Sequence, residues 1–136
     1  MEVLNLKQNK INNIETVKNL KSFNLQKIDL SENKIEDFKP LQNLETKKLK
    51  YINLENNNIS NIEPLAIINS KNKELKYINL RNNKIKNIEI LGRGFLSIGL
   101  KNILLDNNKV IIKDIDYINN KVLKRQEKTL KIIEEI

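Results

Sequence analysis

The chain of 136 residues contains no cysteine, no histidine and no tryptophan, and it has three glycines and two prolines. Without cysteine it can form no disulfide and no thiolate metal site, and it has no thiol nucleophile. Without histidine it lacks an imidazole acid or base, a Ser-His-Asp arrangement and the usual ligands of a zinc site. We therefore expect a protein that is not an enzyme, with no catalytic residue, no cofactor, no metal ion and no small-molecule substrate.

Long apolar runs are missing as well. No stretch approaches the roughly 20 apolar residues that a membrane-spanning helix needs, and residues 1–10 lack the apolar core of a signal peptide. We therefore expect a protein without membrane contact that works in the cytoplasm, with the nucleus as the alternative compartment.

Three residue types dominate what is present: 22 Lys, 24 Asn and 22 Ile make up 68 of the 136 residues. Leu, Ile, Val and Phe together give 19 + 22 + 4 + 3 = 48 residues, which is enough for one domain with an aliphatic core. The net charge of +8 favours an anionic partner. Because Lys, Asn and Ile share A/T-rich codons, a bias of the genome explains the same charge without any binding function.

A motif of eleven residues occurs five times. The copies are MEVLNLKQNKI (1–11), LQKIDLSENKI (25–35), LKYINLENNNI (49–59), LKYINLRNNKI (75–85) and LKNILLDNNKV (100–110). They share the pattern LxxLxLxxNxI and align one asparagine per copy, at intervals of 24, 24, 26 and 25 residues: Asn9, Asn33, Asn57, Asn83 and Asn108. Further apolar residues follow at steps of three, as in the series Ile11, Ile14, Val17 and Leu20.

This pattern resembles the leucine-rich repeat family over about residues 1–110, and its step-of-three continuation is most similar to the short-repeat subclass typified by the regulatory subunit of type-1 protein phosphatase. The resemblance implies an α/β solenoid, an arc of about five coils with parallel strands on the concave face and 3₁₀ or short helical turns on the convex face. It also implies that the five aligned asparagines are structural and bond loop backbone groups of adjacent coils.

We divide the chain into a solenoid over residues 1–112, with five units of 24–26 residues, and a C-terminal segment over residues 113–136. In that segment the apolar residues change to a helical spacing: Ile115, Ile118, Val122, Leu123, Leu130, Ile133 and Ile136. They predict a helix of ~20 residues that caps the last coil, and a helix that projects into a partner or along RNA is the alternative. Since no similar cap precedes the first repeat, we expect another molecule to cover the N-terminal end, and a sequence that is part of a longer chain is the alternative.

Polar and aromatic residues alternate with the buried strand positions and form three exposed columns on the predicted concave face. Tyrosine and arginine often anchor protein interfaces. We therefore predict these protein-binding residues: Tyr51, Tyr77, Asn53, Asn79 and Arg81. Packing of the two tyrosines along neighbouring strands, without a partner, is the alternative.

Lysines follow the two rims of the predicted sheet. One row comes directly after the aligned asparagines, at Lys10, Lys34, Lys84 and Lys109, and another begins the strand segments, at Lys50, Lys76 and Lys101. Basic edges can contact RNA phosphates without reading the base sequence. We predict these RNA-contacting residues: Lys76, Lys84, Lys101, Lys109 and Arg93, the last in the insert Gly92-Arg93-Gly94-Phe95. A solvated lysine rim and a loop that merely tolerates insertion are the alternatives.

The sequence therefore favours a binding or scaffold protein. Our leading hypothesis is a small structural subunit of a ribonucleoprotein particle of the ribosomal type, which contacts RNA through its basic rims and protein through its concave face. The alternative is a leucine-rich repeat adaptor or regulatory subunit that binds protein and makes no RNA contact.

Overall fold

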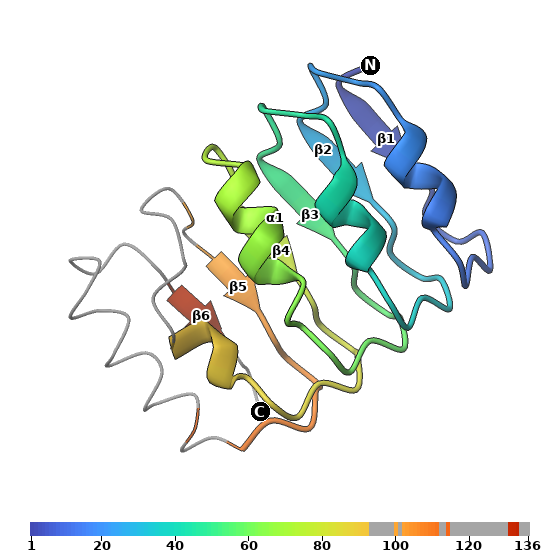
Figure 1. The fold of residues 1–136 in the computed structure, drawn as a ribbon. Coiled ribbons are helices and arrows are strands. Elements are labelled where there is room, and N and C mark those ends of the chain that lie inside the picture. Colours follow the sequence, from blue (N-terminus) through green and yellow to red (C-terminus); the bar gives the residue numbers. More distant parts are fainter. Residues whose placement is uncertain (93–99, 101, 112–113, 115–130, 134–136) are drawn as a thin grey trace.

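The computed structural model describes residues 1–92, 100, 102–111, 114 and 131–133, and these form a single parallel sheet with helical turns behind it (Figure 1). The strands follow one another in chain order. They are β1 (Val3–Asn5), β2 (Lys27–Asp29), β3 (Tyr51–Asn53), β4 (Tyr77–Asn79), β5 (Asn102–Leu104) and β6 (Lys131–Ile133). In the first five strands, each residue pairs with the residue at the same position of the repeat, so the predicted solenoid is confirmed.

The helical turns lie opposite the sheet (Figure 1). They are the 3₁₀ helices η1 (Glu15–Asn19), η2 (Lys39–Asn43) and η3 (Glu89–Gly92) and the α-helix α1 (Leu65–Lys71). The two extra residues of the third unit give room for the seven residues of α1, where the first two units hold 3₁₀ helices of five. The expected 3₁₀ or short helical turns are therefore confirmed, and prolines stand near the start of two of them, Pro40 and Pro64.

The core lies between the sheet and the helical turns and is aliphatic. Ile28, Ile52, Ile78 and Ile103 stand in register on neighbouring strands and are at most 1% exposed. Burial of such a side chain contributes roughly 1.5–3 kcal/mol, so stacking of the coils supplies most of the stability. In the first coil the residues Leu4, Leu6, Ile11 and Leu20 are only partly buried, because β1 lies at the end of the sheet.

The aligned asparagines connect each coil to the one before it. The Oδ1 of Asn57 accepts a hydrogen bond from the Ile35 N–H at 2.9 Å, and its Nδ2 donates to the carbonyls of Leu30 and Leu54. Equivalent bonds are made by three further asparagines: Asn33, Asn83 and Asn108. Asn9, in the first coil, is exposed, and its Nδ2 donates to the Lys7 carbonyl of the same coil.

Two more columns of Asn and Asp lie four residues before and four residues after the aligned asparagines. The first column closes each strand, because each Oδ1 accepts the backbone N–H two residues later: Asn5, Asp29, Asn53 and Asn79. The second opens each helical turn in the same way: Asn13, Asp37, Asn61 and Asn87. Such side chains favour turns because they satisfy a nearby backbone donor. The sequence predicts the first column as exposed concave positions, with Asn53 and Asn79 as binding residues; its role in closing the turns and the second column as a whole were missed, although their spacing is visible in the repeat.

The C-terminal segment differs from the prediction. Of residues 112–130 the structure describes Asp114, which is helical, and the rest of the predicted helix up to residue 130 lies outside the described residues. At Lys131–Ile133 the prediction of helix is wrong, because these residues form β6 and pair in parallel with β5. The edge of β5 offers unpaired backbone groups, and the β-branched pair Ile132-Ile133 suits a strand that satisfies them.

The bridging role of Asn57 can be tested against Asn9, which occupies the same repeat position. Replacing Asn57 with Ala leaves the buried Ile35 N–H without an acceptor, whereas the carbonyls of Leu30 and Leu54 keep the amides of Asn33 and Asn83 as donors. Because an unsatisfied buried group costs about 1–3 kcal/mol, we expect Asn57→Ala to lower the free energy of unfolding by about 2 kcal/mol, and Asn9→Ala to change it by less than about 0.5 kcal/mol. Urea unfolding followed by circular dichroism measures both, and equal losses for the two variants would contradict the bridging role.

Candidate functional site

The concave face carries a group of three side chains that we call the aromatic patch: Lys27, Tyr51 and Tyr77. The β3–β4 register places Tyr51 beside Tyr77, and their rings stack with centroids 4.6 Å apart and planes 6° from parallel. The β2–β3 register places Lys27 beside Tyr51, and its Nζ lies 4.8 Å from the centre of that ring. These are favourable distances for aromatic stacking and for a cation–π contact. All three side chains are half-buried, so part of the patch is open to a partner.

The electrostatic setting keeps Tyr51 neutral. Burial raises the pKa of Tyr51 to about 12, and the nearby Tyr77 and the carboxylates of Asp29 and Glu55 act in the same direction. An ordinary tyrosine is already uncharged at neutral pH, and the raised pKa extends to higher pH the range in which the Tyr51 hydroxyl donates a hydrogen bond.

The other predicted protein-binding residues take part in bonds within the protein. Asn79 was expected to be exposed on the concave face, but it is buried, with 4% of its surface exposed. Its Nδ2 donates to Glu55 Oε2 at 3.1 Å. Arg81 is half-buried and its Nε donates to Asp106 Oδ2 at 2.8 Å. Asn53 is half-buried, and its Oδ1 closes the turn after β3. Of the predicted protein-binding residues, Asn53, Asn79 and Arg81 are therefore already engaged, and Tyr51 and Tyr77 remain as the candidate contact surface.

The predicted RNA-contacting lysines are placed on two different rims. Lys84 and Lys109 are exposed and lie on neighbouring coils, where the backbone N–H of each bonds a carbonyl of the coil before it. Lys76 is exposed at the other end of β4, directly before the strand. Lys101 and Arg93 lie outside the described residues.

Ion pairs neutralise several charges, but not those of the first lysine row. The pairs found in the described ranges are Lys7–Glu32, Lys18–Glu15, Lys50–Glu74 and Arg81–Asp106. None of them involves Lys10, Lys34, Lys84 or Lys109, so in the described part of the chain these four exposed ammonium groups form no ion pair.

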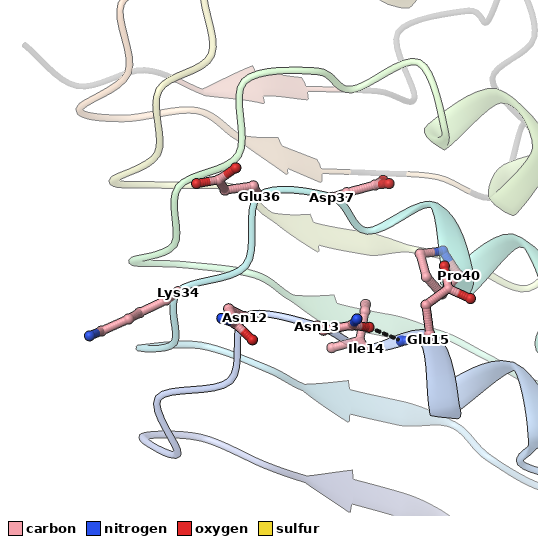
Figure 2. A pocket seen from close by; sticks show the side chains of 8 residues that line it. All are labelled: Asn12, Asn13, Ile14, Glu15, Lys34, Glu36, Asp37 and Pro40. Atoms are coloured by element: carbon pink, nitrogen blue, oxygen red, sulfur yellow. Dashed lines mark hydrogen bonds between the residues drawn. The ribbon is translucent and has the colours of Figure 1, made fainter.

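A pocket of about 450 Å³ lies between the first and second coils, beside the starts of η1 and η2 (Figure 2). It is lined by Asn12, Asn13, Ile14, Glu15, Lys34, Glu36, Asp37 and Pro40. Figure 2 shows the Asn13–Glu15 bond that opens η1, and the side chain of Lys34 extends away from the other groups. Because the charged groups do not converge on one point, we assign no ligand to it.

No three acidic side chains of the described residues gather closely enough to hold a metal ion. No helix in the same residues has the length and apolar character needed to cross a membrane.

Comparison with known proteins gives one family match. The family model described as "Leucine Rich repeats (2 copies)" matches residues 23–67 and again residues 47–93, which together span 71 of the 136 residues (residues 23–93). A comparison with curated proteins finds no match.

Two solved structures of internalins from Listeria monocytogenes str. 4b F2365 are similar to the chain. The alignment with inlF has 19% identity and a TM-score of 0.45 and covers 100% of this chain and 49% of that one. The alignment with inlC2 has 18% identity and a TM-score of 0.43 and covers 98% of this chain and 80% of that one. The chain thus spans about half the length of the first, and at these TM-scores neither likeness adds to the family match.

The raised pKa of Tyr51 can be measured by following phenolate absorbance during an alkaline titration. Compared with a Tyr51→Phe variant, the wild type should retain one protonated phenol above the ordinary pKa of 10.0, with its midpoint near 12. Because the neutral form is favoured in the folded state, this group's contribution to stability is complete below pH 10 and is lost as pH rises toward 12. If the wild-type and Tyr51→Phe curves differ by a group that titrates at 10, the burial of Tyr51 is contradicted.

Proposed function

Because the chain belongs to the leucine-rich repeat family, we propose that it is a non-enzymatic scaffold whose concave face binds a partner protein. Stacked repeats form an extended concave surface that such proteins use for binding. The observation that carries the proposal is the aromatic patch, which lies on that surface and is half-buried before any partner arrives.

The geometry of the patch suits a protein interface. Tyrosine rings supply a large contact area with few rotatable bonds, so little conformational entropy is lost on binding. The stack of Tyr51 on Tyr77, with Lys27 against its outer ring, restricts both rings in advance. Preorganised aromatic residues of this kind are frequent binding hot spots.

A second candidate is contact with RNA phosphates, as in the ribonucleoprotein hypothesis. The observation that favours it is the exposed lysine row, which has no ion pair among the described residues. The family match does not point to RNA, so we place protein binding first. A role as a regulatory subunit, similar to that of the type-1 phosphatase subunit, is a narrower form of the first proposal and rests on the step-of-three pattern alone.

A pull-down from a lysate of the source organism, with and without ribonuclease, separates the two candidates. We expect the wild-type protein to retain a protein partner after ribonuclease treatment and the Tyr51→Ala, Tyr77→Ala double variant to lose it. Phe23→Ala is the matched control, since Phe23 is an aromatic residue that is 62% exposed outside the concave strands. Circular dichroism of each variant verifies that the fold is kept.

A Lys84→Glu, Lys109→Glu variant completes the experiment. Under the first proposal it keeps the partner, because these lysines lie on the rim and not in the patch. If ribonuclease or this charge reversal removes the partner while the tyrosine variant retains it, the protein-scaffold proposal is overturned in favour of RNA contact.

A further inference from the structure

Two carboxylates beside the aromatic patch have only neutral hydrogen-bond donors. The Oδ1 of Asp29 accepts from the backbone N–H and the hydroxyl of Ser31, at 3.0 and 2.6 Å. Glu55 accepts from the Nδ2 of Asn79 at Oε2 and from the Nδ2 of Asn82 at Oε1. Neither carboxylate forms an ion pair in the part of the chain that the structure describes.

Their neighbours on the same face are charge-compensated. Glu32 pairs with Lys7 at 3.1 Å, and Asp106 pairs with Arg81 at 2.8 Å. Lys27 is the cation of the patch itself, and its Nζ lies against the Tyr51 ring. When these two pairs are left out, Asp29 and Glu55 are negative and Lys27 is positive, so the concave positions of β2–β4 have an excess of one negative charge, although Lys7 also interacts electrostatically with both carboxylates and the whole chain carries +8.

The contact between Lys27 and Tyr51 indicates that the tyrosine faces attract cations. Aromatic faces carry negative electrostatic potential and hold a cation at distances such as the observed 4.8 Å. Carboxylates that are already oriented by neutral donors are good acceptors for a guanidinium or an ammonium group. Aromatic faces together with unpaired carboxylates are therefore complementary to a positively charged guest.

We propose that the concave face at β2–β4 binds a basic segment of the partner protein, with an arginine or lysine side chain against the Tyr51–Tyr77 pair and in reach of Asp29 or Glu55. This inference rests on the proposed scaffold function and adds the chemistry of the partner. The net charge of the chain favours an anionic partner, whereas the negative charge around the aromatic patch favours a cationic one.

Lys27 opposes the binding of a basic segment, because its ammonium group occupies one face of Tyr51 and repels a second cation. Replacing Lys27 with Met removes the repulsion and keeps an apolar side chain beside the ring. An acidic partner would instead use Lys27 as a contact, so the same substitution would weaken its binding.

The test is an NMR titration of the full chain, labelled with ¹⁵N, with the peptide Gly-Arg-Gly-Arg-Gly-Arg as the probe and Gly-Glu-Gly-Glu-Gly-Glu as its acidic counterpart. The basic peptide should shift the backbone amide signals of β2–β4. Lys27→Met should tighten its binding about threefold, as expected for a cation–π contact at a solvent-accessible ring. The Asp29→Asn, Glu55→Gln variant removes both charges, keeps the accepting Oδ1 of residue 29 and one of the two accepting oxygens of residue 55, and should weaken binding about fivefold.

Two controls carry the same changes of charge outside the patch. Glu36→Gln with Asp37→Asn removes two negative charges at the pocket between the first two coils, and Lys34→Met removes one lysine of the rim. Both should leave the affinity unchanged. If the Glu36→Gln, Asp37→Asn control weakens binding of the basic peptide as much as the Asp29→Asn, Glu55→Gln variant does, the loss of affinity comes from the overall charge of the protein. That result would overturn the proposal.

Two further outcomes would overturn the inference. One is a shift of the β2–β4 amide signals by the acidic peptide, and the other is weaker binding of the basic peptide to Lys27→Met than to the wild type. If the lysate partner is lost by the tyrosine variant but kept by Asp29→Asn, Glu55→Gln, the scaffold function stands and the basic-segment inference fails. Loss of the lysate partner by both variants, with the controls unaffected, supports both.

Discussion

The amide of one asparagine per coil is the interaction on which the rest of this structure depends. The turn after each strand leaves backbone N–H and C=O groups in the interior, where an unpaired group costs about 1–3 kcal/mol. Asn57 satisfies such groups in its own coil and in the coil before it, and Asn83 does the same one coil later. Because only one stacking register meets this requirement, the isoleucine row from Ile28 to Ile103 packs in register and the aliphatic core is continuous.

The same register builds the surface. Residues at one repeat position fall into a row across the sheet, so Tyr51 and Tyr77 stack because they are 26 residues apart in two consecutive coils. The exposed strand positions can change without disturbing the buried ones, which is how a repeat fold separates shape from function. In this chain Lys27, Tyr51 and Tyr77 lie in one such row, with Asp29 and Glu55 nearby. The concave face therefore carries aromatic rings and carboxylates, although the net charge of the chain is positive.

Features that repeat could be predicted from the sequence, and features that depend on a single residue could not. The strands, the helical turns and the bridging asparagines recur at 24–26 residues, so each copy supports the others. The Arg81–Asp106 pair and the burial of Asn79 arise from contacts between coils at one place. At Lys131–Ile133 the two adjacent isoleucines are compatible with the apolar face of a helix and also with a strand. These residues form a strand because they pair with the backbone of β5. The tyrosine stack was predictable from the alignment, whereas the unpaired carboxylates beside it were not.

Native-state hydrogen exchange of the full chain tests the bridging asparagines most directly. The amides of Ile35, Ile59 and Ile85 follow the turns and donate to side-chain oxygens of Asn57, Asn83 and Asn108 in the next coil. If these bonds hold the coils together, the three amides exchange as slowly as the amides of the strands β3 and β4. Exchange at the rate of exposed loop amides, with the strands still protected, would contradict the account.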